Sequence, residues 1–163
     1  MVAGLQRSPT LRAMVDRIEN GDVIVYLGVQ PLLRRDHIAG LLTWMSSSKR
    51  FRYVRVSINP ELPEKSAIAA LGHELQHVLE VMANPSIVDA TSLESFYAQH
   101  GISMRVSMNS WDSEAARDMG DKVRRDLAGD RPAHIETIKN YDPLAWEAIY
   151  RRARGGVSSG DQQ

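Results

Sequence analysis

The apolar positions between residues 66 and 82 recur at spacings of three and four. Such spacing places side chains on one face of an α-helix, where they can pack against a core. The stripe consists of Ile68, Leu71, Leu75, Leu79 and Met82. His73 and His77 fall on the opposite side of this helix, one turn apart. The pattern therefore predicts a helix that is buried on one flank and carries two histidines on the other.

Three stretches before this helix have the composition of β-strands. They cover residues 22–27, 37–45 and 50–58. The first stretch is apolar on both faces, which predicts a central strand. In the third, the alternation slips at Tyr53-Val54, which predicts a β-bulge. The arginines of the third stretch indicate a solvated sheet face or, alternatively, an edge strand beside a cleft.

Capping residues and apolar spacing predict further helices. They run from Ser8-Pro9 to Asn20-Gly21, over 86–97, over 111–128 and from Asp142 onward. Ser86 is the expected cap of the second, and Ser110 or Asp112 that of the third. Residues 102–108 alternate between apolar and polar, which predicts a short strand or an extended loop. We expect one domain over 1–154 and a disordered tail over 155–163.

The charges of the 163-residue chain balance, because 20 Lys and Arg stand against 20 Asp and Glu. A balanced chain has no long-range field that favours nucleic acid or an anionic membrane as a partner. No apolar run reaches about 18 residues, so no membrane span is expected. The sequence does not begin like a signal peptide, which predicts a soluble cytoplasmic protein, or an exported one if a leader has been removed. The absence of cysteine excludes thiolate ligands, and the oligomeric state stays open.

His73, Glu74 and His77 form an H-E-x-x-H motif. Two imidazoles one helical turn apart can bind the same ion, which leaves Zn²⁺ with two coordination positions to fill. Glu74 lies next to such an ion without being forced onto it, so it can accept a proton from a metal-bound water. We therefore interpret the histidines as metal ligands and Glu74 as the general base.

A second motif lies downstream, where Glu114 is followed one helical turn later by Asp118. H-E-x-x-H followed by E-x-x-x-D resembles the gluzincin metallopeptidases, which usually have Asn at the position of Ser113. The resemblance implies that Glu114 is the third zinc ligand and that Asp118 hydrogen-bonds a ligand histidine. It also implies a minimal zincin-like α+β domain. Such a domain has a small, twisted, mixed sheet of three to four strands, an active-site helix and a separate glutamate helix.

Other classes of metal site fit the residues less well. A metzincin needs Gly and His at the positions of Glu80 and Ala83, and a di-iron bundle needs two E-x-x-H motifs. Glu80 follows both histidines on the same helical stripe, about 10 Å along the axis from His73. We interpret Glu80 as a partner of the ligands or of a salt bridge, and as the first alternative ligand.

Together these residues predict a zinc-dependent metallopeptidase that hydrolyses peptide bonds in a peptide or protein substrate. The oxyanion that develops on the scissile carbonyl during this reaction needs a further hydrogen-bond donor from the protein. The candidates are Tyr97, His100, His134 and Tyr141. The alternative is a catalytically inactive, zinc-stabilised binding domain of the same fold. Glu74 argues against that alternative, because a purely structural site has no need of a general base.

Overall fold

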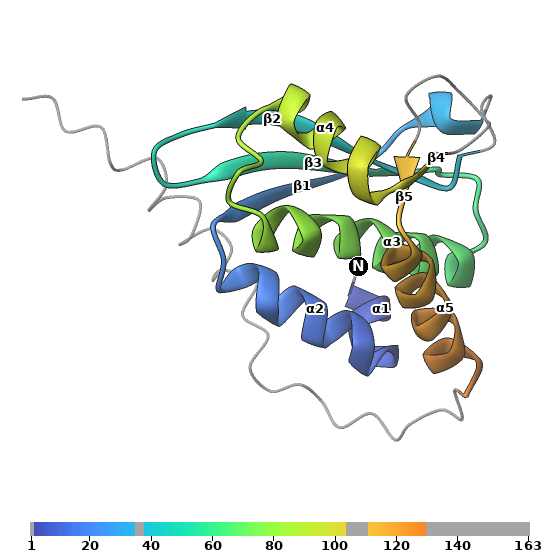
Figure 1. Cartoon of the computed structure of the whole chain (residues 1–163). Helices are drawn as coiled ribbons and strands as arrows, with labels where there is room; N and C mark the ends of the chain where they lie inside the picture. The colour runs from blue at the N-terminus through green and yellow to red at the C-terminus, as the bar shows by residue number, and fades with distance from the viewer. Residues whose placement is uncertain (1, 35–37, 104–110, 130–163) are drawn as a thin grey trace, which may run out of the picture. The chain divides into compact units, whose positions relative to one another are not determined.

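The structure, a computed structural model, describes residues 2–34, 38–103 and 111–129 (Figure 1). The α-helices are α1 (Val2–Arg7), α2 (Pro9–Glu19), α3 (Glu64–Ala83), α4 (Ala90–His100) and α5 (Glu114–Ala128). The strands are β1 (Val23–Val29), β2 (Gly40–Ser47), β3 (Arg52–Ile58), β4 (Ile102–Ser103) and β5 (Trp111–Asp112), and a 3₁₀ turn covers Pro31–Arg34. The predicted helix from Asp142 and the predicted tail lie outside the described residues.

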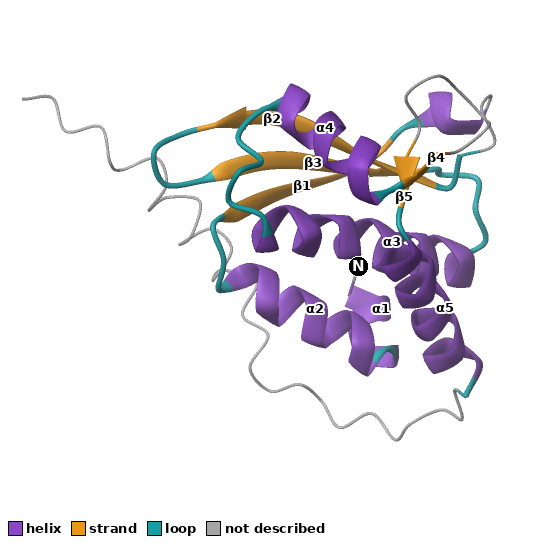
Figure 2. Cartoon of the chain, in the orientation of Figure 1, coloured by secondary structure: helices purple, strands orange, loops and turns teal. Residues whose placement is uncertain are grey.

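The fold is α+β, as the sequence predicts, with helices packed on a three-stranded mixed sheet (Figure 2). The strand order is β1-β3-β2, with β1 parallel and β2 antiparallel to β3. The prediction of a central strand at 22–27 is therefore wrong, and so is an edge position for 50–58. Apolar residues on both faces of β1 are exposed, because Tyr26 is 38% and its neighbour Leu27 43% exposed.

A bulge occurs beside Tyr53-Val54, where one was predicted, but it belongs to the neighbouring strand β2 and not to β3. The register shifts between Trp44 and Ser46 of β2, opposite Val54 and Tyr53. The additional residue is Met45, which is exposed. An edge strand can accommodate an extra residue, whereas β3 must keep its register with strands on both sides.

Helix α3 lies directly beneath the sheet and forms the centre of the core (Figure 1). Four of its five predicted apolar positions are buried, and Met82 is half-buried. Helix α2 contributes Leu11, Met14 and Ile18 to the same core. Helix α5 packs closely against α3, because a Cβ atom at Gly72 would lie 2.6 Å from Val123 Cγ2. Among the described residues, none of the helices combines the length and the apolar character needed to cross a bilayer.

The residue at which each helix begins matches the sequence prediction for α2 but not for α4 or α5. Ser8 caps α2 as predicted, since its hydroxyl accepts from the N–H of Leu11 at 3.1 Å. Helix α4 begins after Asp89 and not at Ser86, because Asp89 and Ser92 form a capping box. Helix α5 begins at Glu114 with Ser113 as its cap, so neither Ser110 nor Asp112 has that role.

Buried Arg52 joins the sheet to the end of α3. Its guanidinium donates to both carboxylate oxygens of Asp22, at 2.9 and 2.8 Å. It also donates to the carbonyl oxygens of Val81 and Asn84, at 2.6 and 2.9 Å. The carbonyls at a helix C-terminus lack partners within the helix, so Arg52 supplies them from the neighbouring strand.

We expect Arg52→Met to lower the free energy of unfolding by about 3 kcal/mol, because it leaves buried carbonyl groups without a donor. Arg55→Met is the matched control, since Arg55 is exposed on the same strand and its loss should change stability by less than about 0.5 kcal/mol. Urea denaturation of the two variants measures the difference. Equal stabilities would show that the Arg52 network does not stabilise the fold.

Candidate metal centre

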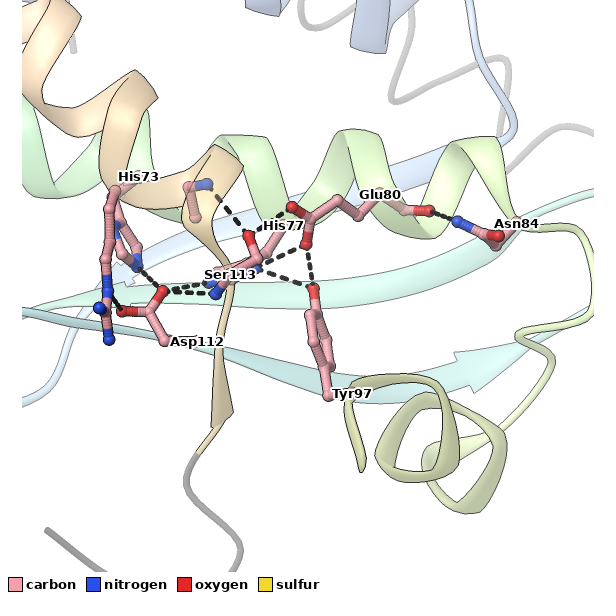
Figure 3. Close-up of polar contacts among 9 residues, drawn as sticks. His73, His77, Glu80, Asn84, Tyr97, Asp112 and Ser113 are labelled. Carbon is pink, nitrogen blue, oxygen red and sulfur yellow. Dashed lines mark hydrogen bonds and ion pairs between the residues drawn. The ribbon is translucent and has the colours of Figure 1, made fainter. Parts of the chain in front are cut away.

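Helix α3 and strand β5 bring His73, His77 and Asp112 together (Figure 3). Asp112 Oδ1 lies 3.1 Å from His73 Nε2 and 3.7 Å from His77 Nε2. One ligand atom from each residue lies within 4.8 Å of the others. Two ligand atoms of a tetrahedral zinc ion lie about 3.3 Å apart, given bonds of about 2.05 Å. The group therefore has donor types and spacings that fit a divalent metal ion.

Asp112 is held at the end of β5 by contacts on both carboxylate oxygens. The N–H of Ser113 donates to Oδ1 at 2.7 Å, and Arg117 Nε donates to Oδ2 at 2.7 Å. Burial opposes the ionisation of Asp112, but the hydrogen bonds from His73 and Arg117 outweigh it and lower the pKa. Burial likewise opposes protonation of His73, whereas its hydrogen bond with Asp112 and the nearby carboxylates raise its pKa. Asp112 is thus a pre-oriented anion beside the two imidazoles.

Glu114 and Asp118 lie on α5, and both are exposed. Neither belongs to the group that the structure forms around the histidines, in which Asp112 is the carboxylate. The sequence prediction placed 111–128 in one helix, whereas Trp111 and Asp112 are extended and pair with β4. No motif spacing indicated Asp112. The only available signal was Ser113, a good N-cap residue that ends the extended segment.

The other side of His77 contacts Glu80 and Tyr97 (Figure 3). His77 Nδ1 lies 2.9 Å from Glu80 Oε2 and 2.8 Å from the Tyr97 hydroxyl, which donates to the same Glu80 oxygen at 2.7 Å. Burial opposes the ionisation of Glu80, but hydrogen bonds from His77 and Ser113 lower its pKa. Glu80 is therefore an anion that contacts His77 from outside the candidate ligand group.

The structure describes two of the four predicted oxyanion donors, Tyr97 and His100, and a polar atom of each contacts other protein groups. Tyr97 is buried, and its hydroxyl is engaged by Glu80 and by Nδ1 of His77. His100 is exposed, stacks on Phe96 and lies with Nδ1 3.0 Å from the Phe96 carbonyl oxygen. His134 and Tyr141 fall outside the described residues.

Glu74 is buried between α3 and β2. Burial raises its pKa, although His77 and His73 act in the opposite direction. A backbone hydrogen bond from Leu42 also reaches the carboxylate. A Cβ atom at Gly40 would lie 2.7 Å from Glu74 Oε1, so only glycine leaves this carboxylate its place against β2. The side chain predicted as the base is thus held beside the two histidines by the edge strand.

No family model, curated protein or solved structure matches this chain. The fold and the site define an α+β domain with a candidate metal centre of two histidines and one aspartate.

Proposed function

We propose that the protein is a zinc-dependent metallopeptidase in which His73, His77 and Asp112 hold the metal and Glu74 is the general base. The observation that carries the proposal is the convergence of these three ligands beside a buried glutamate. Two imidazoles and one carboxylate are a donor set of catalytic zinc sites, which keep a fourth position open. In this proposal Asp112 takes the role that the resemblance assigns to Glu114.

In this proposal the bound metal and Glu74 have separate roles in peptide hydrolysis. Zinc, when bound, supplies a Lewis acid and lowers the pKa of water to about 7. Glu74 accepts a proton from the attacking water and delivers it to the leaving amine. The N–H of Leu42 orients the carboxylate for this transfer, and Gly40 leaves space for it beside β2.

A zinc-stabilised binding domain without turnover is the second candidate. The observation that favours it is the engagement of Tyr97, whose hydroxyl contacts Glu80 and His77 and is not directed at a substrate position. In such a domain the metal would join α3 to β5 and stabilise the fold.

Elemental analysis of the purified protein tests the metal site, and a peptide-cleavage screen with and without a chelator tests the function. We expect about one zinc per chain, cleavage that stops on chelation, and recovery when zinc is restored. Metal-free protein that also fails to bind added zinc would overturn both candidates. Bound zinc without cleavage, combined with a lower melting temperature after chelation, would favour the binding domain.

A further inference from the structure

We propose that Glu80 is a positioning residue of the metal centre, which holds His77 through Nδ1 and fixes the segment of Asp112 through Ser113. The inference rests on the proposed metal site and adds a connection between two of its ligands. It assigns Glu80 a role in metal affinity without making it a ligand.

The first contact orients the imidazole of His77. Residues three positions apart on a helix are neighbours, which allows Glu80 Oε2 to lie 2.9 Å from His77 Nδ1. Tyr97 donates its only hydroxyl proton to the same oxygen, so its own oxygen can accept from Nδ1 together with Glu80. A proton on Nδ1 leaves the lone pair of Nε2 pointing towards Asp112 and the metal position.

The second contact reaches the segment that carries the third ligand. The hydroxyl of Ser113 donates to Glu80 Oε1 at 2.6 Å. The same hydroxyl accepts from the N–H of Ala116 at 3.0 Å, which begins α5. The backbone N–H of Ser113 donates to Asp112 Oδ1 at 2.7 Å. Ser113 therefore donates to both carboxylates, that of Glu80 and that of the proposed ligand Asp112, and links the two.

These contacts occupy both oxygens of Glu80. Oε1 accepts from Ser113, and Oε2 accepts from Tyr97 and faces His77. A carboxylate can accept on both oxygens at once, whereas an amide has a single acceptor oxygen. Glutamine at this position retains the volume of the side chain but cannot satisfy both sets of donors. The site therefore uses the charge and symmetry of a carboxylate.

Zinc titration of Glu80→Gln against a competing chelator tests the inference. We expect affinity about 10- to 100-fold below that of the wild type, as for other groups that orient metal ligands. Glu94→Gln is the matched control, because Glu94 is exposed on α4 and its replacement should leave the affinity unchanged. Urea denaturation of the metal-free variants separates an effect on folding from an effect on the site.

Tyr97→Phe provides a second test that does not depend on the folding of Glu80→Gln. It removes one hydroxyl, keeps the ring edge-on to His77 at 5.2 Å, and should weaken zinc binding less than Glu80→Gln. The double variant should lose less affinity than the two single losses combined, because both residues act on the same nitrogen.

The outcomes separate this inference from the proposed function. Wild-type protein that binds no zinc would overturn both. Zinc-binding wild type with unchanged affinity in Glu80→Gln and Tyr97→Phe would overturn the positioning role alone. Loss of zinc from Glu80→Gln as complete as from His77→Ala would make Glu80 a ligand and also contradict the inference.

Discussion

Replacement of Asp112 by alanine is expected to lower zinc affinity by about 100-fold or more and to abolish peptide cleavage. The binding free energy of zinc at structural sites is about 10–16 kcal/mol, so each of the four protein ligands of such a site contributes on the order of 3 kcal/mol. We expect a contribution of similar size from Asp112. Asp112 Oδ1 is the carboxylate oxygen that faces Nε2 of both histidines. Asp112→Asn should also weaken binding, because the amide keeps the volume but removes the charge.

Glu114→Ala and Asp118→Ala are the controls for this prediction. Both residues are exposed on α5, outside the group formed by the histidines and Asp112. We expect both variants to bind zinc as the wild type does in competition with a chelator. If Glu114→Ala instead empties the site while Asp112→Ala remains loaded, the ligand set implied by the gluzincin resemblance is correct and the one proposed from the structure is wrong.

Replacement of Glu74 by glutamine is expected to leave zinc bound and to reduce the turnover of a cleaved peptide by roughly 100-fold or more. Glutamine has nearly the same shape, fits against Gly40 and can still accept from the N–H of Leu42. It cannot accept a proton from water at neutral pH. The variant therefore removes proton transfer while it preserves the packing of α3 against β2.

Parallel measurements of zinc content and cleavage check this second prediction. Glu94→Gln makes the same chemical change at an exposed position and should retain full activity. Loss of zinc from Glu74→Gln would make Glu74 a ligand. Full turnover with zinc still bound would remove Glu74 from the mechanism and leave proton transfer to another group.

The sequence was sufficient for the features that depend on neighbours along one helix. The stripe from Ile68 to Leu79 is buried as predicted, and helical periodicity placed His73 and His77 together on the other flank, where the structure buries His77 as well. The start of α2 at Ser8-Pro9 was equally local, since a cap bonds within its own first turn. These predictions required no knowledge of distant segments.

Tertiary structure decided the features that depend on pairing between distant segments. Two runs can be equally apolar, and only hydrogen bonding to both neighbours made β3, and not β1, the central strand. The identity of the carboxylate at the metal centre depended on pairing in the same way. Asp112 pairs with Ile102 as a strand, so the helix begins only at Glu114, with Ser113 as its cap. Asp112 then lies beside the histidines, and Glu114 lies on the surface. The sequence by itself determined two histidines and a glutamate on one helix. The third ligand is proposed from strand pairing, which periodicity within a single segment does not encode.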